Sequence, residues 1–560
     1  MESILEYQIA QRLAELGGRI YPQALPLKQW QMQSRCTRDE VVPQPPDSEW
    51  HQVDLPAQWG GSEMTTWFRR QITVPKEFAG KVVVLNIHPG GLDTEGLVSI
   101  NGAPYQGLNT GRNEVLLTRN AEAGQRFEVL IEASAGVKKG PWTFSQCDLA
   151  VLQSQVEAFW YDAKVAFEAA LVMPEESSER ERLLRAVYRS LMKVEPLYGD
   201  EGKFLNSISQ ASEVLRATVY ATPKAETGPR ALLIGHSHLD TAWGWRKKET
   251  VRKLARTFTN TLRCMEQYPE FVFICPPAQL YQFAKEHYPE LYQQVKERIA
   301  EGRWQIWGGM WIEPDCNLAG GEALIRQILF DHRFLRQEFG LETQALFFPD
   351  TYGNTWSLPQ IAKKSGIKYF VSCKLYQGDT NVFPHSLFWW EGIDGTRLLS
   401  VIAYTYGGEF LPESSRSAGS AFTKRGFWTS TSISTVTPME VGGSPDRIWS
   451  MLGVSGISTD YPGQYTEVWR IIFGRSRPLL TNCRSGTMSS ILRTIGLYTP
   501  WRPWRRRTCV APRRCSMMRR PFRLWPAFIP WSVHEPIKGD FDFTGRRNPR
   551  ANLKGFLDLV

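Results

Sequence analysis

Residues 231–240 read ALLIGHSHLD, and this stretch decides how the largest part of the chain folds. The apolar run ALLIG leads directly into two histidines and a carboxylate, which is typical of a buried strand that ends at a polar edge. An amphipathic helix pattern follows over roughly residues 249–267, and the apolar segment FVFIC at 271–275 comes next. The order therefore predicts strand, helix, strand.

The same alternation continues through WQIWGG, ALFFPD and KYFVSC, which are separated by helical patterns. Strands made of continuous apolar runs and joined by helices favour a parallel sheet that is covered on both faces. We therefore predict an α/β, barrel-like (β/α) domain over residues 229–412. In such barrels the chemistry lies at the carboxyl ends of the strands, where the polar residues of this region occur.

The regions around this domain have different patterns. Residues 50–151 contain short alternating segments such as TWFRRQITV and RFEVLIEA between turn residues, which predicts an antiparallel β-sandwich. Its segment SINGAPYQG resembles sugar-binding-like modules, and a purely structural domain is the alternative. Residues 152–228 lack strand patterns and predict a helical connector. Residues 1–49 predict a helix and a Pro-rich segment, and residues 413–560 an irregular tail.

Composition and charge limit the class of protein. The chain has 560 residues, 42% apolar and 22% charged, as expected for a soluble protein of several domains. No apolar run approaches the roughly 20 residues of a membrane span, and the N-terminus lacks the apolar segment of a signal peptide. Nine scattered cysteines argue against a disulfide framework and favour a reducing, cytoplasmic compartment.

The net charge of +9 comes from the tail. Residues 411–560 hold 23 Lys and Arg against 9 Asp and Glu, whereas the first 410 residues hold 43 against 48. We therefore expect no nucleic-acid partner and no membrane partner for the globular part.

The first candidate site lies in GHSHLDTAW, residues 235–243. Alternate residues of an extended segment point to the same side, so His236, His238 and Asp240 can converge. Imidazole and carboxylate together suit a divalent ion such as zinc. The alternative is a set of satisfied polar residues at a strand end.

Two further strand ends carry acidic residues. Asp350 follows an apolar run and is a candidate nucleophile or metal ligand, or else a helix N-cap. Glu313 and Asp315 either touch substrate hydroxyls or orient their loop, and we favour the second interpretation. Cys316 and Cys373 have no sequence partner that suggests a nucleophile, so we expect buried spectators.

Four segments, taken together and in order, resemble the glycoside hydrolase family 38 α-mannosidases, most closely the cytosolic and vacuolar branch. They are GHSHLDTAWGW, MWIEPDCNLAGGEALIRQ, FFPDTYGNTWSLPQI and NVFPHSLFWWEGIDGTRLL. The resemblance implies that His238 and Asp240 hold zinc and that Asp350 both binds the ion and attacks the anomeric carbon. It also implies that Trp243 lies beside the bound mannose, while His236 supports the site from outside.

The expected function is zinc-dependent, retaining hydrolysis of terminal α-mannosides in oligosaccharide catabolism. Mannose has neighbouring O2 and O3 atoms that a cation can clasp, which favours ring distortion toward the transition state. Zinc is the expected cofactor, and Co²⁺ is an alternative ion. The expected partner is an α-mannoside oligosaccharide, and the association of this chain with itself as a homo-oligomer stays open.

The resemblance ends near residue 412. Residues 426–537 contain 15 Arg and no Lys, in an irregular mixture with Trp and Pro. An Arg/Trp tail that binds nucleic acid is one interpretation, but we favour a shifted reading frame. Codons for residues 488–496, read from the third nucleotide, can give ELYLENHR, which is similar to a family stretch.

We therefore expect no counterpart of the family's acid/base aspartate or of its remaining zinc-binding histidine. The flanks of His534 do not fit that role. The chain is also expected to end before the family's β-rich C-terminal domains, so its activity is expected to be impaired.

Two other functions stay open from the residues. One is a non-catalytic carbohydrate-binding protein, which would bind saccharides without turnover. The other is a metal-dependent sugar deacetylase, which would release acetate from N-acetylated sugars.

Overall fold

A computed structural model describes residues 3–45, 49–90, 95–109, 111–135, 140–195, 200–220, 230–351, 353–376, 383, 385 and 387–403. Four later strands are described by their backbone, namely β20 (Thr431–Val436), β21 (Gly486–Thr487), β22 (Asp540–Phe541) and β23 (Arg547–Asn548). The chain divides into two compact units, residues 1–497 and 498–560. In the second unit, β22 and β23 form an antiparallel pair.

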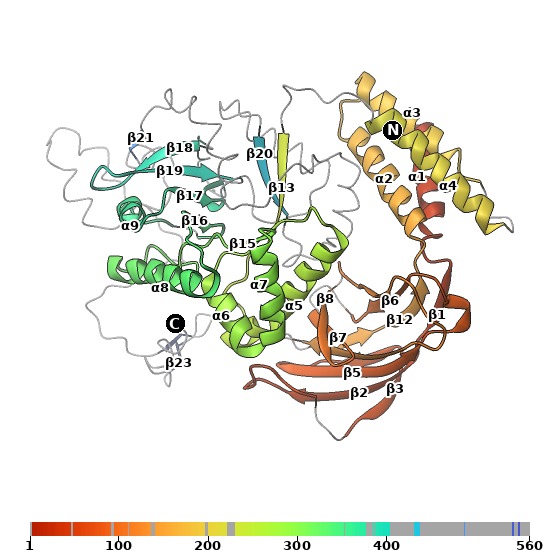
Figure 1. Ribbon diagram of the computed structural model, residues 1–560, viewed down its shortest axis with the longest axis horizontal. Coiled ribbons are helices and arrows are strands. Elements are labelled where there is room, and N and C mark those ends of the chain that lie inside the picture. The colour runs from red at the N-terminus through yellow and green to blue at the C-terminus, as the bar shows by residue number, and fades with distance from the viewer. Residues whose placement is uncertain are drawn as a thin grey trace. The chain divides into compact units, whose positions relative to one another are not determined.

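A β-sandwich forms the N-terminal part of the first unit (Figure 1). One sheet has the order β1-β12-β6-β9 and the other β3-β2-β5-β10-β7-β8, while β4 pairs with β11. The strands are β1 (Gln23–Pro26), β2 (Gln29–Cys36), β3 (His51–Asp54), β4 (Ala57–Trp59), β5 (Met64–Thr73), β6 (Val83–His88), β7 (Glu95–Ile100), β8 (Ala103–Leu108), β9 (Glu114–Thr118), β10 (Arg126–Ser134), β11 (Trp142–Phe144) and β12 (Gln146–Val151).

Alternation of apolar and polar side chains explains why these segments form a sandwich. In β10 the residues from 126 to 131 alternate between outward and buried positions, so one face of the strand enters the core. Trp30, Phe68 and Phe144 pack there with the aliphatic residues of β6. The predicted antiparallel sandwich is confirmed.

The predicted start of the sandwich at residue 50 is too late. β1 pairs antiparallel with β12, and β2 pairs with both β3 and β5. QALP has only four residues, all exposed, and QWQMQSRC is rich in polar residues, so both strands were included in the region predicted as a helix and a Pro-rich segment.

A bundle of helices adjoins the sandwich in sequence. It contains α1 (Ile4–Gly17), α2 (Ser154–Leu171), α3 (Ser178–Leu191) and α4 (Glu201–Leu215), followed by the short helix η2 (Arg216–Tyr220). The four α-helices share one apolar core, to which Ile9, Phe159 and Val187 belong. Arg180 also forms an ion pair with Glu6 at 2.7 Å, which joins α3 to α1. The N-terminal helix therefore packs with the segment predicted as a helical connector.

The α/β region begins at β13, and its described strands form two sheets. One has the order β15-β14-β13-β20 and is parallel. The other has the order β16-β17-β19-β18-β21 and is parallel except where β18 meets β19. The elements are β13 (Arg230–His236), α5 (Lys247–Gln267), β14 (Phe273–Ile274), α6 (Ala278–His287), α7 (Pro289–Ala300), β15 (Trp304–Gln305), α8 (Gly321–Phe339), β16 (Ala345–Phe348), α9 (Leu358–Lys364), β17 (Tyr369–Ser372), β18 (Leu387–Glu391) and β19 (Arg397–Ile402).

The two sheets of this region contact each other through side chains. Ile274 of the first sheet and Phe347 of the second belong to one apolar cluster. Gly309, in the loop after β15, lets that loop approach the start of β16 closely, since a Cβ there would lie 2.5 Å from the carbonyl oxygen of Ala345. Gly309 also has a positive φ of 72°, which favours glycine. The α/β layering agrees with the sequence prediction, whereas closure into a barrel stays a prediction.

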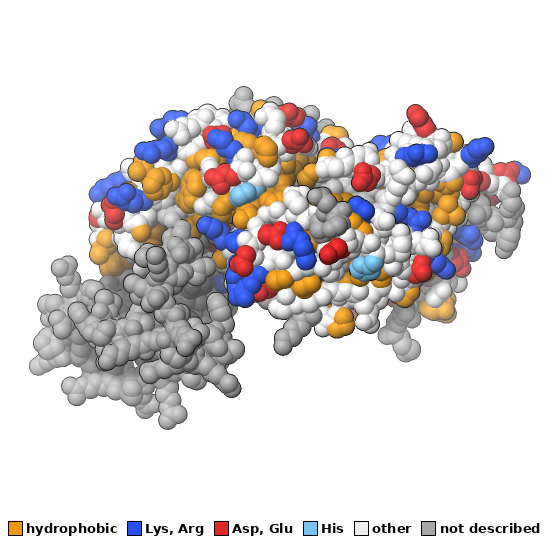
Figure 2. Space-filling view, turned by 90° about the horizontal axis from the view of Figure 1, so that it is seen from below, with side chains coloured by type: hydrophobic (Ala, Val, Ile, Leu, Met, Phe, Trp, Pro, Cys, Tyr) orange, Lys and Arg blue, Asp and Glu red, His pale blue; other side chains and the backbone are white. Residues whose placement is uncertain are grey.

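The described surface mixes charges of both signs. On the face seen in Figure 2, Lys and Arg side chains are interspersed with Asp and Glu. Within the described part of the chain, no helix has the length and apolar character needed to cross a membrane.

Helix α8 carries a buried acidic residue. The side chain of Asp331 is fully buried, and neither of its oxygens has a hydrogen-bond partner in the described structure. Burial raises the pKa of Asp331 well above its ordinary value, because the charged form loses its hydration. A raised folded-state pKa means that stability falls as the pH rises above the ordinary range of an aspartate.

We expect Asp331→Asn to remove this pH dependence. Asparagine has nearly the same shape and does not ionise, so the variant should be more stable than the parent at pH 8 by about 1 kcal/mol or more. Thermal unfolding between pH 4.5 and pH 8 measures the effect. Equal pH slopes for the two proteins would contradict it.

Candidate active site

Polar residues gather at the ends of β13 and β16. His236 ends β13, and His238 and Asp240 follow it, while Asp350 lies two residues beyond β16. His238 is almost fully buried. The loop between β15 and α8 supplies Glu313, which contacts residues from both strand ends.

One carboxylate joins these strand ends. Glu313 Oε2 lies 3.0 Å from Nε2 of His238. Its Oε1 accepts hydrogen bonds from the amide of Asp350 at 2.8 Å, from the amide of Thr351 at 2.6 Å and from the Thr351 hydroxyl at 2.7 Å. A carboxylate oxygen has about two lone-pair directions, so the acceptor capacity of Oε1 is fully used. Glu313 therefore fixes the position of the segment that carries Asp350 relative to His238.

Asp315 organises the same loop locally. Its Oδ1 accepts hydrogen bonds from the amides of Asn317 at 2.9 Å and Leu318 at 3.2 Å, as in an Asx turn. These contacts agree with the interpretation that Glu313 and Asp315 orient their loop.

Asp350 has a cationic neighbour that the sequence analysis missed. Its Oδ1 accepts a hydrogen bond from Nζ of Lys374, which opens the short helix η3 (Lys374–Tyr376) just after β17. β16 and β17 are adjacent parallel strands, so residues just beyond their carboxyl ends are neighbours. Lys374 lies two residues beyond β17, and a single lysine at that position carries no sequence pattern of its own.

Trp243 is an exposed aromatic residue near these strand ends. The residue is 73% exposed, and its ring contacts Trp245 edge to face with centroids 5.5 Å apart. An exposed indole offers a flat apolar face, which is the surface that a sugar ring stacks on.

His236 lies behind the site. It is fully buried, its Nδ1 is 3.2 Å from the carbonyl oxygen of Ile274, and its ring packs against Phe347. Burial, with a smaller contribution from His238, lowers the pKa of His236 to about 3, so the ring is neutral. This placement fits a supporting role.

The two cysteines of this region are unsuited to nucleophilic chemistry. Cys316 and Cys373 are buried, and burial raises the pKa of each thiol, with nearby carboxylates adding to the effect. The reactive thiolate form is therefore suppressed. The expectation of buried spectators agrees with this environment.

The predicted zinc ligands do not form a ready metal site. Within the described residues there is no group of three or more His, Cys, Asp or Glu side chains that could hold a metal ion. The Nε2 atom of His238 faces Glu313, and the carboxylate of Asp350 faces Lys374. The donor types suit zinc, but His238, Asp240 and Asp350 as placed do not fit the ion.

Comparison with known proteins defines the class of the two main domains. Residues 229–440 match the glycosyl hydrolases family 38 N-terminal domain, and residues 21–150 match the alpha-mannosidase jelly roll domain. These two regions are therefore similar to a family 38 glycosyl hydrolase domain and to the jelly-roll domain of α-mannosidases. The predicted resemblance is confirmed.

Particular relatives are α-mannosidases. The chain is 31% identical to alpha-mannosidase G of Dictyostelium discoideum over 63% of this chain and 33% of that protein. It is 31% identical to alpha-mannosidase 2C1 of Homo sapiens over 69% of this chain and 38% of that protein. It also aligns with the crystal structure of an alpha-mannosidase from Enterococcus faecalis V583, with a TM-score of 0.35 and 20% identity, over 48% of this chain and 29% of that one. The chain thus spans about a third of the length of the curated relatives it matches.

Proposed function

We propose that this chain acts on α-mannosides as a retaining glycoside hydrolase, with terminal α-mannosyl residues of oligosaccharides as substrates. The observation that carries the proposal is the placement of Asp350 in the family 38 domain. Its backbone is held by Glu313 beside His238, and its carboxylate is held by Lys374.

Asp350 is the proposed nucleophile. In a retaining enzyme one carboxylate attacks the anomeric carbon and forms a glycosyl ester, while a second carboxyl about 5–5.5 Å away protonates the leaving oxygen. Lys374 holds Oδ1 of Asp350, and the contacts of the neighbouring amides with Glu313 fix the backbone. Asp350 is therefore oriented before substrate arrives, which lowers the entropic cost of reaching the reactive geometry. Trp243 is the proposed stacking surface for the sugar.

The expected absence of an acid/base aspartate concerns residues outside the described part of the chain. Without that proton donor, hydrolysis of substrates with poor leaving groups would fall about 10²–10⁴-fold. A leaving group that departs as a stable anion does not need the proton. The chain should therefore retain activity mainly on activated aryl α-mannosides.

An assay on two substrates tests the proposal. We expect the full chain to hydrolyse dinitrophenyl α-mannoside much faster than methyl α-mannoside, with zinc present in the buffer. Saccharide binding without turnover of either substrate would instead indicate the non-catalytic carbohydrate-binding function. Release of acetate from N-acetylated sugars would indicate the deacetylase.

We also propose that His238, Asp240 and Asp350 bind a divalent cation, zinc first and Co²⁺ as a substitute. Two features support this proposal. The donor types match zinc, and one carboxylate, that of Glu313, contacts both His238 and the backbone of Asp350. The described arrangement is not a finished ligand set, so binding would require these side chains to exchange partners.

Metal analysis checks the proposed ligands without any assay of activity. We expect about one zinc per chain after dialysis, and zinc affinity at least about 10-fold weaker in His238→Ala and in Asp240→Asn. His88→Ala on the sandwich is the control and should keep the metal. Full zinc binding by both ligand variants, or none by the parent, would contradict the proposal.

The remaining sequence predictions stay proposals. They are a closed barrel, a cytoplasmic location, the absence of a nucleic-acid partner and a possible homo-oligomer.

A further inference from the structure

The jelly-roll sandwich contacts the helix that follows the first strand of the catalytic domain. Gly107 of β8 lies so close to α5 that a Cβ there would be 2.6 Å from the carbonyl oxygen of Arg256 and 2.8 Å from Nδ2 of Asn260. Without a side chain at Gly107, the sheet can lie directly against the helix. The first turns of α5 are therefore shared between the two domains.

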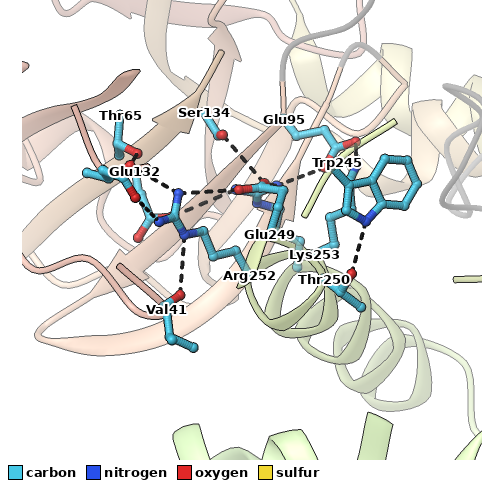
Figure 3. A network of polar contacts seen from close by, with 12 residues as sticks. Val41, Thr65, Glu95, Glu132, Ser134, Trp245, Glu249, Thr250, Arg252 and Lys253 are labelled. Carbon is cyan, nitrogen blue, oxygen red and sulfur yellow. Dashed lines mark hydrogen bonds and ion pairs between the residues drawn. The ribbon is translucent and has the colours of Figure 1, made fainter. Parts of the chain in front are cut away.

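A partly buried polar network fixes this contact (Figure 3). Glu95 of β7 accepts hydrogen bonds from Lys253 and, at 2.8 Å, from Nη1 of Arg256. Arg256 also pairs with Glu249 at 2.9 Å. Burial would raise the pKa of Glu95, but the two cations outweigh it and hold that pKa below its ordinary value. Glu95 is thus an ionised anchor of the sandwich for α5.

The same turns of α5 hold the loop that carries Trp243. Nε1 of Trp245 donates to the hydroxyl of Thr250 at 2.9 Å, and that hydroxyl donates to the carbonyl oxygen of Thr241 at 2.8 Å. The ammonium group of Lys253 lies 4.4 Å from the ring centroid of Trp245, which is a cation–π contact. Figure 3 shows Glu95, Lys253 and Trp245 side by side.

These contacts form one continuous series. Glu95 binds Lys253, Lys253 lies against Trp245, and Trp245 packs edge to face against Trp243. Trp243 is 73% exposed, and the ring contact of its indole within the described residues is with Trp245. Trp245 and the side chains behind it in this series therefore restrain the Trp243 ring.

We propose that the jelly-roll domain positions the sugar-stacking residue: Glu95, acting through Lys253 and Trp245, sets the orientation of Trp243. The sandwich then serves as a structural part of the sugar site. The effect on sugar affinity rests on the proposed function, whereas the effect on the orientation of Trp243 does not. Glu95, Lys253 and Trp245 are positioning residues, since they act through Trp243.

Fluorine NMR of the full chain labelled with 5-fluorotryptophan tests the positioning directly. The signals of Trp243 and Trp245 are assigned by their loss in Trp243→Phe and Trp245→Phe. We expect both signals to shift or broaden in Lys253→Met and in Glu95→Gln, and Lys253→Arg to restore them, because arginine keeps both the ion pair and the cation–π contact.

Arg252→Met is the matched control. Arg252 is a buried cation of the same helix that binds the carbonyl oxygens of Thr37 and Glu40 and pairs with Glu249, whereas the cation over the Trp245 ring is Lys253. We expect this variant to leave the Trp243 signal in place. An unchanged Trp243 signal in both Lys253→Met and Glu95→Gln would overturn the proposal. So would an equal change in Arg252→Met, since the coupling would then reflect a general loosening of the domain contact.

Titration with methyl α-mannoside separates this inference from the proposed function. The expected result is a shift of the Trp243 signal, with a dissociation constant about 3- to 10-fold higher in Lys253→Met and restored in Lys253→Arg. If the variants move the Trp243 signal but the sugar never does, the stacking role in the proposed function fails and the positioning by the sandwich stands. If the sugar moves the signal with equal affinity in all variants, the affinity part of the inference fails and the proposed function stands.

Discussion

Asp350→Asn is expected to lower the hydrolysis of dinitrophenyl α-mannoside by about 10³-fold or more. An amide cannot form the glycosyl ester on which retention depends, so the first step has no nucleophile. The amide contacts of residues 350 and 351 with Glu313 are made by the backbone and persist in the variant. We therefore expect a folded but inactive protein, measured as an initial rate beside a thermal unfolding curve.

Asp394→Asn is the matched control for this substitution. Asp394 is an exposed turn residue whose oxygens accept hydrogen bonds from Thr396, outside the candidate site. The control should keep the parent rate. Parent-like turnover by Asp350→Asn would contradict the role assigned to Asp350, whatever the control does.

Glu313→Ala is expected to have the second largest effect, and on two properties. Loss of the carboxylate leaves the amides of Asp350 and Thr351 without their acceptor, which should cost about 2–4 kcal/mol of stability. It also releases the backbone of Asp350, and a displacement of about 1 Å from the reactive geometry can cost about 10²-fold in rate. Urea unfolding and the aryl mannoside assay measure the two losses.

Two further variants define what Glu313 does. Glu313→Gln keeps one acceptor oxygen for the amides of Asp350 and Thr351 and can donate its NH₂ to Nε2 of His238, so it should recover most of the stability. Asp315→Ala removes the turn contacts with the amides of Asn317 and Leu318 in the same loop and should leave the rate within about 3-fold. If Glu313→Ala were as active as Asp315→Ala, the carboxylate would not position the nucleophile.

Local patterns predicted much of the fold. Continuous apolar runs such as ALLIG and ALFF, each followed by an amphipathic pattern, were sufficient to predict the α/β region. The alternation of apolar and polar residues in RFEVLIEA was sufficient to predict the sandwich. The first sandwich strands were missed because QALP is short and entirely exposed, so its sequence carries no burial pattern.

The candidate site was only partly predictable. His238 and Asp350 could be singled out because each follows an apolar run at a strand end. Lys374 could not, because a single lysine has no pattern and its role depends on the pairing of β16 with β17. The four contacts of Glu313 join segments 37 to 75 residues apart, which no local window contains.

The tail after residue 412 remains a prediction from the sequence. Apart from the backbone of four short strands, it lies outside the described residues. Sequencing of the coding DNA around residues 411–535 tests the frame hypothesis. An intact frame that encodes this tail would contradict it.

Covalent trapping identifies the nucleophile itself, because formation of the glycosyl ester from a reagent with a good leaving group needs no acid/base residue. The full chain is incubated with 5-fluoro-α-mannosyl fluoride, which keeps O2 and O3 of the sugar, digested, and analysed by mass spectrometry of its peptides. In retaining hydrolysis the acid/base residue also assists the second step, so the adduct should accumulate in a chain that lacks one. The account predicts one fluoromannosyl group on Asp350 and none in Asp350→Asn. A sugar attached to another residue, or no adduct from a protein that binds the reagent, would contradict it.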